Sequence, residues 1–182
     1  GWPAREWAGP VWQREVRGST ITSLHATDGA VVVMDREQES AVVVRARSGR
    51  LQSRIMLRGD ASRLSVEGEE AETGPTATTC VGPYVCHLRG NTLWAWHAAT
   101  GRPLWPAEVP PATDRLDVLD ERHLGVSCPP SRYLVIDAGD GQTRTDLQLE
   151  DSVVPPESAA VDRGRLYLFL RLGPNSSQSR LS

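Results

Sequence analysis

The sequence predicts an all-β fold, and three observations lead to that prediction. Short apolar runs alternate with a period of two, which is the spacing of a strand and not of a helix. Clusters of Gly, Pro, Asp and Ser separate these runs, as turns do. No stretch of a dozen residues combines helical apolar spacing with capping signals. The clearest runs are "AVVVMD" at 30–35, "AVVVRAR" at 41–47, "YVCHLR" at 84–89, "YLVID" at 133–137 and "RLYLFLR" at 165–171.

A strand-turn-strand unit recurs three times along the 182 residues. Aligning "VVVRARSGRLQS", "WAWHAATGRPLW" and "LVIDAGDGQTRT" superposes Gly49, Gly101 and Gly141, which are 52 and then 40 residues apart. A period near 40 with about four short strands per unit predicts a β-propeller of four-stranded antiparallel blades. The other aligned positions are Ala46, Ala98 and Ala138, three residues before the glycine, then Val44, Trp96 and Ile136, five before, and Val42, Trp94 and Leu134, seven before.

Each feature of the unit has a physical role in such a blade. Bulky side chains at every second position fill one face of a strand, and that face packs on the neighbouring blade. The glycine ends the strand in a turn that needs positive φ. The alanine permits close approach of an adjacent backbone. Because both faces of a blade must be covered, we expect no blade to be stable alone.

The segment "LWAWHAATGRPLW" at 93–105 resembles the repeat of the quinoprotein-like, or PQQ-like, β-propeller family, and the chain is most similar to its non-enzymatic branch. That repeat reads roughly Leu-Tyr-Ala-Leu-Asp-Ala-x-Thr-Gly-x-x-x-Trp. The resemblance implies that Trp105 docks between blades, and that Ala98, Thr100 and Gly101 form the turn belonging to it. Gly49 and Gly141 are the corresponding turn residues of the flanking units.

The three units depart from this pattern at two positions. Ser53 and Thr145 stand where the docking Trp is expected, and Arg45 and His97 replace an Asp that only Asp137 retains. The resemblance covers residues 10–172 and depends mainly on the central unit.

The predicted propeller is incomplete, with about three and a half blades. The segment "GPVWQREV" is expected to be an outer closing strand with its own docking residue, Trp12. Either a further segment of a longer chain or a second copy is expected to complete the ring, because open sheet edges are unfavourable. The predicted blades are 19–57, 62–109, 114–149 and an incomplete 153–182, with the closing strand at 9–16.

The function predicted for this chain is non-catalytic recognition. Quinone-dependent enzymes of the same family have adjacent cysteines, a stacking Trp and metal ligands that include Asn; here no two cysteines are adjacent and only Asn91 and Asn175 are present. We therefore expect no catalytic residue, no cofactor and no metal. The alternative is a quinone-dependent dehydrogenase-type propeller enzyme with a degenerate cofactor site.

Three smaller patterns have structural explanations as good as their functional ones. Cys80 and Cys86 could pair only if their strands are neighbours, and buried free thiols are the simpler interpretation. The "DAGDG" segment at 137–141 could hold calcium, but turn chemistry explains both of its Asp residues. Ser23, His25 and Asp28 are too close along one strand for a catalytic triad.

Composition limits the partners. All 20 basic residues are Arg, 23 residues are acidic and the net charge is −3, so we expect no nucleic-acid partner. No apolar run is long enough to cross a bilayer, and we expect no membrane insertion. The Arg-only usage resembles bacterial GC-rich coding. We expect a cytoplasmic module of a larger bacterial protein, or an exported one if an upstream signal was removed.

Protein or ligand recognition is expected to involve the loops. The candidate contact segments are the acidic 66–74 and the Pro-rich 109–112, 128–131 and 153–157.

Overall fold

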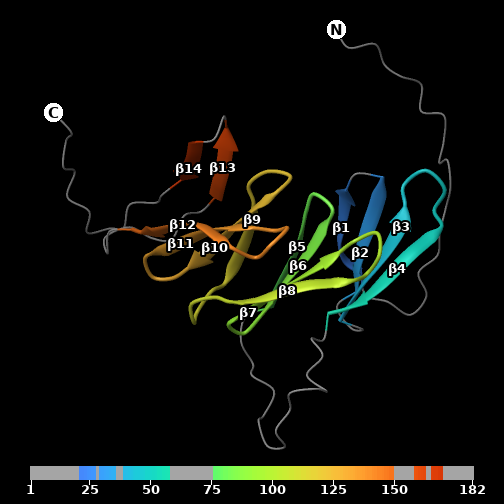
Figure 1. Ribbon diagram of the computed structural model, residues 1–182, viewed down its shortest axis with the longest axis horizontal. Helices are drawn as coiled ribbons and strands as arrows, with labels where there is room; N and C mark the ends of the chain where they lie inside the picture. The colour runs from blue at the N-terminus through green and yellow to red at the C-terminus, as the bar shows by residue number, and fades with distance from the viewer. Residues whose placement is uncertain are drawn as a thin grey trace, which may run out of the picture.

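Figure 1 shows a computed structural model of the chain, which describes residues 21–27, 29–35, 39–57, 76–149, 158–162 and 165–169. Every regular element in these residues is a β-strand, and the strands form antiparallel sheets in which spatial order follows chain order. The prediction of an all-β chain built from four-stranded antiparallel sheets is therefore confirmed.

In the part of the chain that the structure describes, three sheets have four strands each and a fourth has two. Sheet 1 consists of β1 (Ile21–Thr27), β2 (Ala30–Asp35), β3 (Ser40–Arg45) and β4 (Leu51–Met56). Sheet 2 consists of β5 (Thr76–Val81), β6 (Tyr84–Arg89), β7 (Thr92–His97) and β8 (Pro103–Glu108). Sheet 3 consists of β9 (Arg115–Val118), β10 (His123–Cys128), β11 (Arg132–Asp137) and β12 (Thr143–Gln148). Sheet 4 consists of β13 (Ser158–Asp162) and β14 (Arg165–Phe169).

The sheets are arranged face to face in an open arc (Figure 1). The first strand of each sheet contacts the first strand of the next, so that β1, β5, β9 and β13 form the inner edge. The fourth strands, β4, β8 and β12, lie on the outer edge. Successive side chains of a strand point to opposite faces, so each central strand supplies two different apolar layers.

The aligned apolar positions fill these layers. Val43 belongs to the layer between sheets 1 and 2, whereas its neighbours Val42 and Val44 lie on the opposite face of sheet 1. Trp96 contributes to the layer between sheets 1 and 2, and Ile136 contributes to the layer between sheets 2 and 3. The layer between sheets 3 and 4 contains Leu119, Tyr133, Val135, Ala159, Val161, Leu166 and Leu168.

The cysteines lie in these layers as free thiols. Cys80 is paired across the strands with Val85, and Cys86 with Thr79, so the two side chains point to opposite faces of sheet 2. Cys80 is in the layer between sheets 1 and 2, and Cys86 is in the layer between sheets 2 and 3. The disulfide that the spacing left open does not form. Burial raises the pKa of Cys80 to about 12.

Trp105 connects the outer strand of sheet 2 to the turn of sheet 3. Its indole Nε1 donates a hydrogen bond to the carbonyl of Ala138 at 3.1 Å. The ring lies against Gly141, whose φ is +75°, and a Cβ on that glycine would come within 2.6 Å of Trp105 Cδ2. The indole therefore lies where two sheets meet, with its polar atom satisfied by the backbone of the neighbouring sheet.

Ser53 makes the corresponding contact between sheets 1 and 2. Its hydroxyl donates to the carbonyl of Ala98 at 2.6 Å, and a Cβ on Gly101 would lie 3.2 Å from Ser53 Cβ. Gly49 and Gly101, with φ of +64° and +68°, end the same kind of turn. Ser53 thus keeps the hydrogen bond without the large side chain.

The other residues at predicted turn and docking positions have exposed side chains or lie outside the described residues. Thr100 closes its turn through a backbone hydrogen bond from its N–H to the carbonyl of His97, 3.3 Å long, and its side chain is exposed. Thr145 is exposed on the outer strand of sheet 3. Trp12 and the predicted closing strand at 9–16 lie outside the described residues.

Gly141→Ala should destabilise the chain more than Gly29→Ala. Both glycines have positive φ, but nothing lies within 4 Å of a Cβ built on Gly29. Gly29→Ala should therefore cost only the conformational penalty, about 1–2 kcal/mol, and Gly141→Ala a further about 1–3 kcal/mol from displacing the Trp105 indole. Urea unfolding of the two variants measures the difference in the free energy of unfolding. Equal losses would show that the indole does not occupy the space over Gly141.

Candidate functional site

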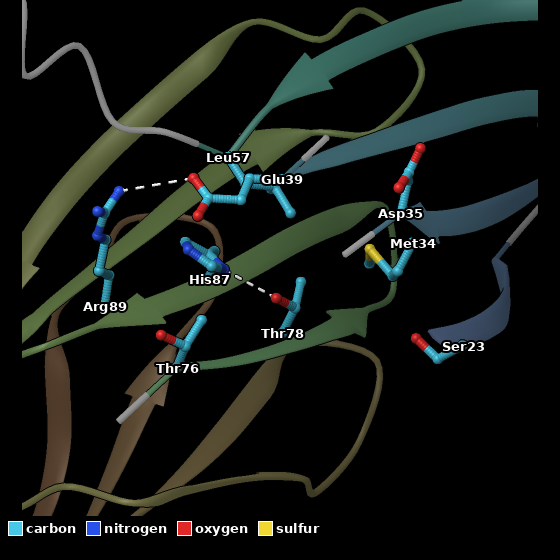
Figure 2. A pocket seen from close by; sticks show the side chains of 9 residues that line it. All are labelled: Ser23, Met34, Asp35, Glu39, Leu57, Thr76, Thr78, His87 and Arg89. Carbon is cyan, nitrogen blue, oxygen red and sulfur yellow. Dashed lines mark hydrogen bonds and ion pairs between the residues drawn. The ribbon is translucent and has the colours of Figure 1, made fainter. Parts of the chain in front are cut away.

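A cleft of about 600 Å³ opens between sheets 1 and 2, at the edge where β2 and β6 end (Figure 2). Sheet 1 and its loops contribute one wall and sheet 2 the other. The lining residues are Ser23, Met34, Asp35, Glu39, Leu57, Thr76, Thr78, His87 and Arg89. Clefts of this size are common ligand sites when a few polar groups converge in them.

His87 is the most deeply placed ionisable group on the sheet 2 wall. It lies on β6 directly opposite Thr78 on β5, is only 5% exposed, and its Nδ1 is hydrogen-bonded to Thr78 Oγ1 at 2.8 Å. Burial lowers the pKa of His87 to about 4, and the charge of Arg89 adds to this while that of Glu39 opposes it. The imidazole is therefore neutral at pH 7.

The hydrogen bond to Thr78 leaves His87 Nε2 as the polar atom of the ring that a ligand can use. A neutral imidazole has one donor and one acceptor nitrogen, so the tautomer decides which of the two Nε2 presents. Figure 2 shows the ring among the other lining side chains, between Thr78 and Arg89.

The next layer of the same chain shows what packing alone requires at these positions. His87 pairs with Trp94, and Val126 pairs with Leu134; Trp94 and Leu134 each stand seven residues before a turn glycine. Val126 is therefore the counterpart of His87 in sheet 3.

Its cross-strand partner on β9, Leu116, is by the same pairing the counterpart of Thr78. Val126 is fully buried. The layer between sheets 1 and 2 therefore has a polar pair, Thr78 and His87, where the layer between sheets 2 and 3 has an apolar pair, Leu116 and Val126.

Charged groups from both sheets surround the opening of the cleft. Asp35 ends β2 and is 2% exposed, and Glu39 lies in the turn that precedes β3. Arg89 ends β6, and its Nη1 lies 3.8 Å from Glu39 Oε2 across the gap between the sheets. Both of these side chains are partly exposed, so their ion pair contributes little to stability. It does place a cation and an anion together beside His87.

The "DAGDG" segment is a turn in the structure. Asp137 accepts hydrogen bonds from Arg122 Nε at 2.8 Å, Arg144 Nη2 at 2.9 Å and the N–H of Gly139 at 2.9 Å. Burial raises the pKa of Asp137, but these hydrogen bonds and the charge of Arg122 outweigh that effect, and the pKa lies below its usual value. Two guanidinium groups therefore occupy the carboxylate that a calcium ion would need. Within the described ranges, no cluster of three or more metal-ligating side chains occurs.

Ser23 and His25 lie on the same face of β1, and Ser23 Oγ is 3.0 Å from His25 Nε2. Burial lowers the pKa of His25. Of the described residues in this sequence pattern, Ser23 is the one that lines the cleft. Asp28, the third residue considered with them, lies outside the described residues.

The Pro-rich segments contribute to the core as well as to the surface. Val109 and Cys128 are buried in the layer between sheets 2 and 3, and Thr113 Oγ1 donates to the carbonyl of Pro110 at 2.7 Å. Pro111 and Pro130 are exposed. The candidate segments at 66–74 and 153–157 lie outside the described residues.

The predicted docking residues and the cleft are separate parts of the molecule. Trp105, Ala98, Gly101 and Gly141 lie at the outer edge, where the turn of one sheet meets its neighbour, and none of them lines the cleft. The sequence analysis did not single out His87 or Thr78. Strand pairing in the structure relates His87 to Val126, and counting back from the aligned glycines does not.

Comparison with known proteins supports the fold and leaves the family open. No protein-family model and no curated protein sequence matches the chain. BamB from Moraxella catarrhalis is similar in structure, with a TM-score of 0.56 and 15% identity over 85% of this chain and 45% of that one. The computationally designed Ika4 protein has a TM-score of 0.53 and 15% identity over 88% of this chain and 98% of that one.

Hydrazine synthase from Kuenenia stuttgartiensis has a TM-score of 0.52 and 11% identity over 82% of this chain and 43% of that one. The chain thus spans less than half the length of the BamB and hydrazine synthase chains that it matches. The structural neighbours are β-propellers, and the chain has the same fold with an open ring. No helix in the described part of the chain is long and apolar enough to cross a membrane.

Stability should fall on acidification because His87 is neutral in the folded chain. Unfolded His87 has an ordinary pKa of 6.5 and folded His87 a pKa of about 4, so the unfolded state binds more protons between these values. The contribution of neutral His87 to the free energy of unfolding is fully present above pH 6.5 and is lost as the pH falls toward 4. Its size is about 3 kcal/mol at most.

Urea unfolding across this pH window should show a steeper loss for the natural chain than for Thr78→Leu/His87→Val, which carries the residues of the next layer. His25→Gln keeps His87 and removes another imidazole whose pKa burial lowers, so this variant should retain the part of the loss that belongs to His87. Parallel pH profiles for the natural chain and the double variant would contradict a buried neutral His87.

Proposed function

We propose that this chain is a non-catalytic β-propeller module that recognises a protein partner or ligand, as a sensor or interaction part of a larger bacterial protein. The observation that carries the proposal is the polar pair His87–Thr78, which faces a cleft at one end of the apolar layer between sheets 1 and 2. The cleft is the proposed contact site.

The energetics of the layer favour a binding role for this pair. A buried imidazole and hydroxyl stabilise a fold less than well-packed apolar side chains of similar volume, even when they are hydrogen-bonded to each other. Sheet 3 has Val126 and Leu116 at the same positions, so the fold does not require polar groups there. A polar pair that displays Nε2 in a cleft is explained by a ligand that hydrogen-bonds to it.

The chemistry of the described nucleophiles also favours binding over catalysis. Burial raises the pKa values of Cys80, Cys86 and Cys128, so all three thiols stay protonated at pH 7. A protonated thiol is a poor nucleophile. His87 is held by Thr78 and lies among groups suited to hydrogen bonding: Ser23 and Thr76 supply further hydroxyls.

We infer further that the chain is a divergent member of the PQQ-like repeat group. The support is the similarity of "LWAWHAATGRPLW" to that repeat, together with the contact that its Trp105 makes with the turn of the next sheet. Propeller folds carry unrelated functions in their loops and clefts, so this relationship does not itself assign a partner.

Affinity capture with a cleft variant tests the proposed function. The natural chain and Thr78→Leu/His87→Val are immobilised and exposed to extract from the source bacterium, and bound proteins and small molecules are quantified by mass spectrometry. A specific partner should be retained about tenfold less by the double variant, because each lost hydrogen bond to a polar ligand weakens binding by about 1 kcal/mol or more. Arg165→Gln, an exposed change in sheet 4, is the control and should bind as the natural chain does.

Equal retention by the natural chain and the double variant would exclude the cleft as the contact site. A parallel thermal melt with quinone and calcium addresses the enzymatic alternative. The proposal expects no change in melting temperature. A rise of about 5–10 °C, as expected for a ligand well above its Kd, would instead favour a quinone-binding enzyme.

A further inference from the structure

The hairpin that joins β3 to β4 carries a concentrated positive charge. Arg45, Arg47, Arg50 and Arg54 are all exposed, and residues 40–57 contain no Asp or Glu. We call these four residues the basic hairpin. The chain as a whole is acidic, with a net charge of −3, so this local excess stands out against its background.

None of the four guanidinium groups forms an ion pair with a described carboxylate. Arginines elsewhere in the described chain are usually neutralised. The pairs in sheet 3 and its loops are Arg115–Asp117, Arg122–Asp137, Arg132–Asp146, Arg144–Asp137 and Arg144–Asp140. The charge of the basic hairpin is therefore available to another molecule.

The corresponding hairpin of sheet 3 has the opposite charge at two of these positions. When Gly49 and Gly141 are superposed, Arg45 coincides with Asp137 and Arg54 coincides with Asp146. The turn geometry is the same in both hairpins, because in each the glycine N–H donates to the carbonyl four residues earlier, at 2.9 Å and 2.8 Å. Arginine is thus not needed to form this turn.

The backbone of the basic hairpin is well ordered by its own hydrogen bonds. Arg45 N–H donates to the carbonyl of Arg50 at 2.8 Å, and Ser48 N–H donates to the carbonyl of Arg45 at 3.3 Å. The side chains of Arg45, Arg47 and Arg50 therefore project from one tight turn. Leu51, which is 52% exposed, adds an apolar group beside them. Arginine next to exposed apolar surface is a common composition for a protein interface.

The basic hairpin lies at the opposite end of sheet 1 from the cleft. Strand β3 begins at Ser40, next to the cleft residue Glu39, and ends at Arg45 in the hairpin (Figure 1). A molecule bound to the hairpin would therefore not occupy the cleft.

We propose that the basic hairpin binds an acidic segment of a protein partner. Unpaired guanidinium groups bind carboxylates through two parallel hydrogen bonds, and such pairs fix orientation as well as attract. A short acidic peptide matches four charges on one hairpin. Nucleic acid is a poorer match, since tight binding to it uses more phosphate contacts and the rest of the chain is negatively charged.

Fluorescence anisotropy with a labelled Asp- and Glu-rich peptide tests this proposal. The natural chain should bind the peptide, more weakly as salt rises. Arg47→Gln/Arg50→Gln should weaken binding about tenfold, because two charge-assisted contacts are lost. The matched control is Arg132→Gln/Arg165→Gln, which removes the same charge from two exposed arginines of sheets 3 and 4 and should change Kd by less than about twofold.

Thermal melting is the control for folding. Both double variants should have the melting temperature of the natural chain, because all four substituted side chains are exposed. Absence of peptide binding, or equal weakening by the two double variants, would overturn the proposal. Tighter binding of a single-stranded oligonucleotide of equal charge would overturn it in favour of nucleic acid. Thr78→Leu/His87→Val should bind the peptide normally, so a failure at the cleft and a failure at the hairpin give different results.

Discussion

The structure depends on the contact that joins the outer edge of one sheet to the turn of the next. In each case, a side chain four residues after one turn glycine donates a hydrogen bond to an alanine carbonyl that stands three residues before the next turn glycine. This contact holds two twisted sheets at a spacing where the apolar side chains between them can close-pack. The layers themselves supply most of the stabilisation, but only when the sheets are held face to face.

Because sheets 2 and 3 each lie between two neighbouring sheets, their central strands carry two separate sets of packing requirements. Val43 and its neighbour Val44 face different layers, and so do Cys80 and Cys86. The polar cleft is a local departure from this arrangement, confined to one end of one layer. Its position lets polar side chains line a cleft without disturbing the strand pairing on which the sheet depends, since His87 and Thr78 use only their side chains there.

The fold was predictable from the sequence because its signals are local. A period of two identifies the strands, and Gly49, Gly101 and Gly141 mark equivalent turns; both are short-range patterns that the backbone imposes directly. The position of Trp105 over the next turn followed from the resemblance of one unit to a known repeat. The cleft was harder to predict from the sequence, because its formation requires the pairing of Thr78 with His87 and the approach of Asp35 from another sheet. In "YVCHLR", His87 looks like an ordinary strand residue, and no local feature distinguishes it.

The hydrogen bond of Ser53 has a consequence for how repeats of this kind diverge. The Ser53 hydroxyl donates to the carbonyl of Ala98, which is equivalent to the Ala138 carbonyl that the Trp105 indole reaches one sheet further along. The geometry of the joint can therefore outlast its most recognisable residue, since any short donor of suitable reach preserves it.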